Sequence, residues 1–153
     1  MAIRQLTIQR YRGLEKFEWC PAPGVNALIG PGDVGKTTVL QAISLLFNTA
    51  PSSSASEYDY YDRNVEDGFE ISAVIGDLPE TLRRNYPTAL RGWKDNQLHG
   101  LPDEDGAEAV ILVSVRGNND LEISHEVVFS DDCCQSAKWD TFQTEHFGII
   151  RRH

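Results

Sequence analysis

The stretch LIGPGDVGKTTVLQAI, residues 28–43, decides how the rest of the chain is interpreted. It runs from an apolar segment through a glycine-containing turn to a lysine and two threonines, and then becomes apolar at helical spacing. Residues 30–37, GPGDVGKT, match the phosphate-binding pattern G-x-x-x-x-G-K-[ST]. We therefore predict a buried strand over residues 25–30, a nucleotide-binding loop, and a helix directly after it.

Each residue type in the loop has a physical reason. Glycines allow the backbone to curl so that its N–H groups face anionic oxygens, and the helix N-terminus adds a partial positive charge. A lysine brings a full charge to the β and γ phosphates, a first threonine hydroxyl is placed to ligate Mg²⁺, and a second reaches toward an α-phosphate oxygen. The predicted nucleotide-binding residues of the loop are Gly30, Gly32, Asp33, Val34, Gly35, Lys36, Thr37 (also the Mg²⁺ ligand) and Thr38.

The pattern around the loop predicts an α+β domain of the P-loop NTPase type. Alternating residues at 5–8 and 15–19 indicate two antiparallel strands before the loop. The helix after it should bury Val39, Ile43 and Leu46, with Leu40 and Phe47 beside them. Further predictions are a Pro/Ser-rich linker over 49–68, an alternating strand at 69–75, a short helix near Pro79, a loop over 92–108, a hairpin of strands at 107–115 and 121–129, and a helix over 135–147.

Composition narrows the function classes. Residues 1–153 suit one domain or a piece of one, with strands, loop and helix in 1–48 and a β-meander with short helices in 69–153. The formal net charge of −9 argues against a broad surface for nucleic-acid phosphates. Three cysteines without metal or redox spacing indicate reduced thiols and a cytoplasmic protein, with Cys20 expected in the core. No apolar run approaches the roughly 20 residues that cross a bilayer.

Two strands before the P-loop strand are unlike small GTPases or nucleotide kinases. The opening IRQLTIQRYRGLEKFEW, the segment VNALIGPGDVGKTTVLQAISLLF and the later YDYYDRNVEDGFEISAVIGDLPETL resemble the ABC-type ATPase heads of the SMC/RecF group, most closely the OLD (overcoming lysogenization defect) family. The resemblance is specific over residues 1–48, moderate over 58–83 and thin beyond. Within the loop the chain departs from the family, which often has Asn where Gly32 or Asp33 stands.

The resemblance implies ATP and Mg²⁺ as cofactors and a role in DNA processing, in repair or phage defence, by an ATP-dependent endonuclease. It also implies that Arg12, in the YRG step, lies near the nucleotide, although an arginine paired with an acidic neighbour is the alternative. Asp59 and Asp62 fall where a metal-side residue is expected, but a solvated acidic loop is the preferred interpretation.

Several parts of such an ATPase are missing from these 153 residues. No apolar run ends in the acidic pair of a Walker B strand, and there is no signature motif of the LSGG type and no nuclease carboxylate cluster. The chain is therefore expected to bind ATP but hydrolyse it poorly alone. Self-association, or a second subunit or domain, would supply the absent motifs, and DNA would be bound by the intact protein.

Two alternatives stay open. A stand-alone P-loop kinase or GTPase would transfer a phosphoryl group or prefer GTP. A non-enzymatic nucleotide-binding interaction module would use the nucleotide only to stabilise a protein interface.

Overall fold

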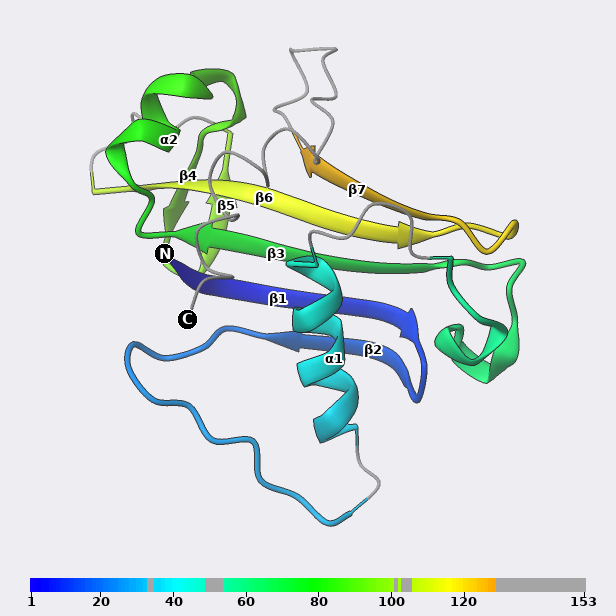
Figure 1. The fold of residues 1–153 in the computed structure, drawn as a ribbon. Helices are drawn as coiled ribbons and strands as arrows, with labels where there is room; N and C mark the ends of the chain where they lie inside the picture. The colour runs from blue at the N-terminus through cyan, green and yellow to red at the C-terminus, as the bar shows by residue number, and fades with distance from the viewer. Residues whose placement is uncertain (33–34, 49–53, 101, 103–105, 129–153) are drawn as a thin grey trace, which may run out of the picture.

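The structure, a computed structural model, describes residues 1–32, 35–48, 54–100, 102 and 106–128. Figure 1 shows an antiparallel sheet with one long helix, α1, lying across one face. In chain order the elements are β1 (Ala2–Tyr11), β2 (Leu14–Trp19), α1 (Lys36–Leu46), the 3-10 helices η1 (Glu57–Asp59) and η2 (Tyr61–Arg63), β3 (Phe69–Gly76), α2 (Glu80–Asn85), the 3-10 helix η3 (Pro87–Ala89), β4 (Arg91–Lys94), β5 (Gln97–His99), β6 (Glu108–Gly117) and β7 (Ile123–Val128).

The strands of the described residues pair in the order β2-β1-β3-β6-β4-β5, with β7 also paired to β6. All of these pairs are antiparallel. Leu6 and Ile8 of β1 pair with Trp19 and Phe17 of β2, so the apolar members of the two alternating segments share one face. The two strands predicted before the loop and the hairpin predicted after it are confirmed.

The main core lies between this face of the sheet and α1. Most of its buried residues come from β1, α1, β3, β6 and β7, and the others are Ala55, Tyr60, Leu78, Leu82 and Ala89. As predicted, the 69–75 strand places Phe69, Ile71, Ala73 and Ile75 inward, each at most 2% exposed. Hydrophobic burial on one sheet face and one helix stripe is what holds α1 in place.

Helix α1 is rotated slightly from its predicted orientation. Its buried residues are Val39, Ala42 and Leu46, whereas Leu40 is 61% exposed. The stripe at 39, 42 and 46 follows the i, i+3, i+7 spacing of a helix. The prediction that Leu40 lies beside the buried face of the helix is therefore wrong.

Two segments carry more structure than their composition indicated. The predicted loop over 92–108 contains the β4–β5 hairpin, closed by Asp95 and Asn96, both with positive φ. In the predicted linker, the part from Ser54 onward contains η1 and η2, and Tyr60 there is 1% exposed. The helix predicted over 135–147 lies outside the described residues.

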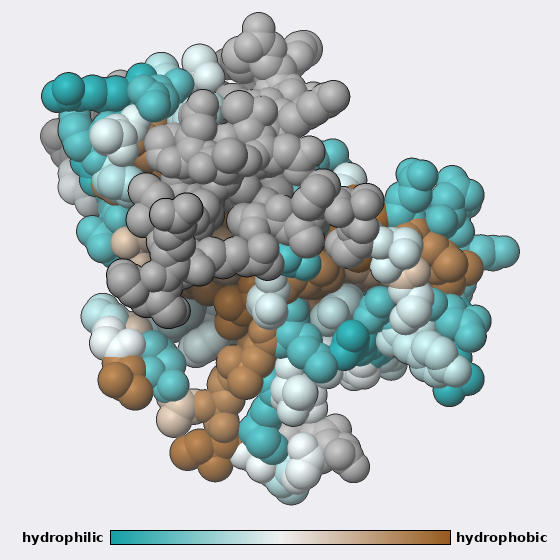
Figure 2. Space-filling view, in the orientation of Figure 1, coloured by the Kyte–Doolittle hydropathy of each residue, from teal (hydrophilic) through white to brown (hydrophobic). Residues whose placement is uncertain are grey.

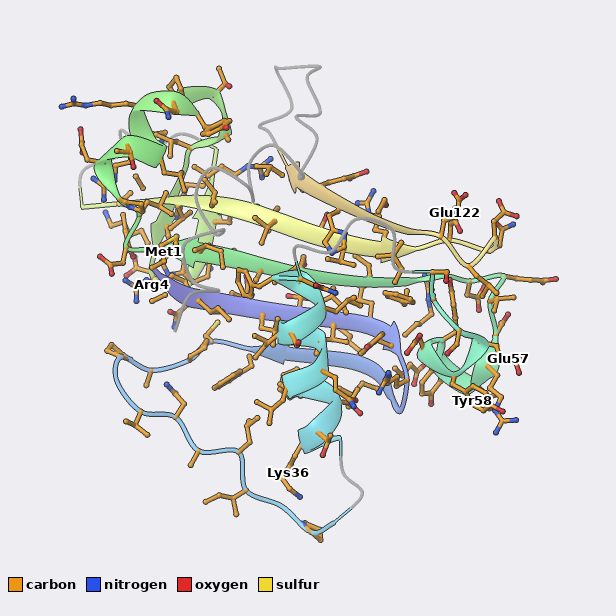
Figure 3. The ribbon with its side chains drawn as sticks, viewed as in Figure 1. Met1, Arg4, Lys36, Glu57, Tyr58 and Glu122 are labelled. Atoms are coloured by element: carbon orange, nitrogen blue, oxygen red, sulfur yellow. The ribbon has the colours of Figure 1, made fainter. Side chains whose placement is uncertain are left out.

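An ion pair connects the two long strands β1 and β6 at the end of the sheet where β1 begins. Arg4 makes a two-pronged ion pair with Glu108, from Nε to Oε2 at 2.8 Å and from Nη2 to Oε1 at 2.9 Å. Gly76 of β3 passes between them, and a Cβ there would lie 2.6 Å from the Glu108 carboxylate and 2.7 Å from the Arg4 side chain. This ion pair fixes the end of the sheet marked by Met1 and Arg4 in Figure 3.

Candidate nucleotide-binding loop

Helix α1 begins directly after a glycine in the left-handed region. Gly35 has φ 86° and ψ 5°, and its carbonyl accepts the first helical hydrogen bond from Val39 N–H at 2.9 Å. A side chain at this position would also collide with Leu14, because an ideal Cβ would lie 2.7 Å from its Cδ2 atom. Glycine is favoured here mainly by conformation and also by space, since the Leu14 side chain would have to move to admit a Cβ. The first turn of α1 carries no acidic residue to oppose an anion.

The Lys36 side chain folds back over the loop that precedes it. Its Nζ donates to the carbonyl oxygens of Gly30, Pro31 and Gly32 at 2.6, 2.8 and 3.3 Å. An ammonium group has three N–H donors, so these contacts occupy its full capacity. Figure 3 shows Lys36 at the N-terminal end of α1, next to the loop. The lysine thus holds the loop in a curled conformation.

The other predicted loop residues take positions around Lys36. Thr37 is exposed in the first turn of α1, and Thr38 is half-buried. Gly30 and Gly32 are exposed, and no atom lies within 4 Å of a Cβ built at Gly32. Asp33 and Val34 lie outside the described residues.

The predicted strand over residues 25–30 is not formed. The segment has no assigned secondary structure, and Val25 and Ile29 are 100% and 91% exposed. Figure 1 shows it running away from the sheet before it returns to α1. The residues have the apolar character of a strand buried on both faces, but such a strand needs hydrogen-bonding neighbours on its sides, and the described strands pair only with one another. The strand prediction is wrong for this structure.

Three large apolar residues near the loop are exposed: Val25 and Ile29 before it and Leu40 in α1. Figure 2 shows a band of apolar side chains beside this helix. Cys20, expected in the core, is also exposed, because it follows the last residue of β2 where no described element covers it.

Arg12 lies between α1 and the 3-10 segment. Its Nε and Nη2 donate to Asp59 Oδ1 at 2.9 and 2.8 Å, and its Nη1 donates to Gln41 Oε1. Arg12 is therefore paired with an acidic neighbour, which was the alternative predicted from the sequence. Sequence reasoning missed Gln41, whose only signal was its place on the polar side of the predicted helix.

Asp59 is not part of a solvated acidic loop. Burial alone would raise its pKa, but hydrogen bonds from the Ser56 backbone and from Arg12, together with the Arg12 charge, outweigh burial and hold the pKa below the usual value. Asp59 also forms the capping box of η1 with Ser56, because its carboxylate accepts a hydrogen bond from the Ser56 backbone N–H. Within the described residues no three His, Cys, Asp or Glu side chains are grouped to hold a metal ion.

Comparison with known proteins gives this geometry a family. A family model described as an AAA ATPase domain matches residues 1–141. The chain belongs to this family of ATPase domains. The match spans the loop, α1 and Arg12.

Curated relatives of the ATPase domain point in the same direction. The DNA replication and repair protein RecF of Anaeromyxobacter sp. is 30% identical over 118 residues, covering 72% of this chain and 31% of that protein. RecF of Erwinia tasmaniensis is 46% identical over 46 residues, covering 30% of this chain and 13% of that protein. The chain thus spans less than a third of the length of these relatives.

A solved structure shares the fold. A chain from a study of ATP-driven dimerization and DNA-stimulated activation of SMC ATPases superposes with a TM-score of 0.60 at 14% identity, covering 97% of this chain and 79% of that one. The ATPase domain therefore shares its fold with that chain. Over the described residues, no helix is both long and apolar enough to span a membrane.

Proposed function

We propose that this chain binds ATP with Mg²⁺ through residues 30–38, as the N-terminal part of an OLD/RecF-like ATPase. The observation that carries the proposal is the Lys36 ammonium held over the curled loop at the start of α1. In the bound state the β and γ phosphate oxygens replace the three carbonyl oxygens as its acceptors. The ammonium makes charge-assisted hydrogen bonds in both states, but the phosphate oxygens also carry negative charge, so the exchange adds attraction between opposite charges.

The remaining loop groups have matching tasks. The backbone amides of Gly30, Gly32, Asp33, Val34 and Gly35 would face the phosphates, and the first N–H groups of α1 add donors with no partner within the helix. Thr37 is exposed beside Lys36, so its hydroxyl can ligate Mg²⁺, which neutralises phosphate charge. Thr38 would reach an α-phosphate oxygen. Arg12 at the nucleotide remains a prediction from the family resemblance.

The exposed 25–30 segment indicates what the chain lacks. A segment that is apolar like a doubly buried strand, yet 91% to 100% exposed at Ile29 and Val25, is suited to pairing with strands supplied from elsewhere. We propose that another part of the intact protein, a second subunit, or a second copy supplies them together with the Walker B and signature motifs. In that form the protein would use ATP-dependent head engagement to control DNA processing in the cytoplasm, in repair or phage defence and of the ATP-dependent endonuclease type.

Equilibrium titration with ATP and GTP, with and without Mg²⁺, tests the binding step. Lys36→Ala should weaken ATP binding by about 2 kcal/mol or more, roughly thirtyfold, because a charged donor is removed from a phosphate site. Lys16→Ala, an exposed lysine on β2, is the matched control and should bind like the native chain. Equal affinity of the Lys36→Ala and native chains would reject the proposed site.

A further inference from the structure

Arg12 connects the helix that follows the loop to a separate surface. One end of its guanidinium contacts Gln41 in α1 and the other contacts Asp59 in η1. Gln41 is five residues after Lys36, about 7.5 Å along the helix axis. No direct contact between Arg12 and a nucleotide is needed for this connection.

The Asp59 side of the connection is held firmly. The backbone N–H of Arg12 donates to the Asp59 carbonyl at 2.9 Å, and Asp59 Oδ2 accepts from Ser56 N–H at 2.9 Å and from Ser56 Oγ at 3.2 Å. Tyr11 and Tyr60 form an adjacent β-bridge, and the Tyr60 hydroxyl donates to the Asn118 carbonyl. A displacement of Arg12 therefore reaches the whole segment 56–63.

The helix side is arranged so that movement at the loop reaches Gln41. At the far end of α1, His125 Nε2 of β7 lies 3.1 Å from the Leu45 carbonyl oxygen and holds the last turn. The first turn continues directly from the loop that Lys36 keeps curled. Val39 and Ala42 pack α1 against the sheet on either side of Gln41, so when Lys36 exchanges its carbonyl acceptors for phosphates, the change reaches Gln41 as a small movement of the helix over this contact.

The segment beyond Arg12 forms an open hollow of about 490 Å³ lined by Arg12, Gly13, Tyr58, Tyr60, Asp62 and Arg63. Tyr58 is 62% exposed, with the Arg63 guanidinium 4.8 Å from its ring centroid. Figure 3 shows Tyr58 and Glu57 beside the end of β1, away from Lys36. This surface is therefore separate from the nucleotide-binding loop.

We propose that Arg12 is a positioning residue that couples nucleotide occupancy of the loop to the surface formed by residues 56–63, through Gln41 and Asp59. Binding of ATP moves α1 slightly over the sheet, changes the Gln41–Arg12 contact, and alters the opening of the 56–63 segment. The inference rests on the proposed function, because it requires nucleotide in the loop. It assigns regulation of a second surface to residues that need not touch the ligand.

Hydrogen exchange of the full chain, with and without Mg²⁺-ATP, tests this coupling, with ATP affinity measured in parallel by calorimetry. In the native chain ATP should change the exchange protection of residues 56–63 by about fivefold or more, the lower end of usual coupling between sites. Gln41→Leu removes the acceptor and should reduce this change to less than about twofold. Gln41→Glu keeps an acceptor for Arg12 and should retain it.

Gln5→Leu is the matched control, since Gln5 also makes a side-chain hydrogen bond, here as the donor to Glu18 at 2.7 Å, but on the β1–β2 pair. It should leave the ATP response at 56–63 unchanged. If Gln41→Leu fails to fold, Arg12→Lys serves instead, because lysine keeps the charge but lacks the fork that reaches two partners. ATP binding with no response at 56–63, or an equal response in Gln41→Leu, overturns the coupling alone, whereas absence of ATP binding overturns both proposals.

Discussion

Replacing Gly35 by alanine tests the geometry at the junction of loop and helix. The backbone there has φ 86°, in the left-handed region, and the added Cβ would lie 2.7 Å from Leu14 Cδ2 and 3.3 Å from Leu14 Cγ. Two separate penalties therefore apply. One is conformational and belongs to residue 35 alone, and the other is steric and depends on Leu14.

The magnitudes follow from these two causes. A left-handed conformation costs an L-residue roughly 1–2 kcal/mol. Overpacking costs about 1–3 kcal/mol, and the lower part of that range applies because the half-buried Leu14 side chain can move. Gly35→Ala should therefore lower the free energy of unfolding by about 2–3 kcal/mol. With Leu14→Ala already present only the conformational penalty remains, so the two changes should couple by about 1 kcal/mol.

Urea unfolding of the native chain, both single variants and the double variant measures this cycle. A loss below about 0.5 kcal/mol for Gly35→Ala would show that the loop does not adopt the left-handed conformation. An equal loss in the native chain and in the Leu14→Ala variant would show that β2 does not pack against the start of α1.

Three further predictions concern the core, pH and turnover. Leu46→Ala should lower the free energy of unfolding in urea by about 2–5 kcal/mol, because Leu46 is 0% exposed between α1 and the sheet, and a change under about 1 kcal/mol would contradict that packing. The hydrogen bond and charge of Arg4 lower the pKa of Glu108, and Asp59 has a lowered pKa because Ser56 and Arg12 outweigh its burial. Both carboxylates therefore stabilise the fold above the ordinary carboxyl pKa of about 4, and this stability is lost as pH falls through their lower pKa values in the folded chain. In the double variant Asp59→Asn/Glu108→Gln, the free energy of unfolding in urea should therefore fall less steeply between about pH 5 and 3 than in the native chain. A coupled phosphate assay should detect no ATP turnover by the purified chain, and robust hydrolysis would show that this chain contains a complete active site.

The sheet and α1 were predictable because each has a strong local period. Alternation at 69–75 placed four side chains on the buried face correctly, and the apolar spacing after Lys36 located the helix. The β4–β5 hairpin was missed because its strands have only four and three residues. The Asp95-Asn96 pair that closes it is a turn signal that can now be recognised.

The candidate site was predictable only in part, because a motif fixes residue types but not their partners. The loop residues follow from glycine, lysine and threonine spacing. The 25–30 strand was predicted from apolar character alone, which does not reveal whether neighbouring strands are present. The Arg12–Asp59 pair joins residues 47 positions apart, and the Gln41 contact joins residues 29 apart, so only the fold brings them together.

A crystal structure of the chain with Mg²⁺ and a non-hydrolysable ATP analogue tests the central claim most directly. We predict that Lys36 Nζ leaves the Gly30, Pro31 and Gly32 carbonyls and lies within hydrogen-bonding distance of the β and γ phosphates, with Thr37 on the metal. A bound analogue elsewhere on the surface, with Lys36 still on those three carbonyls, would contradict the account.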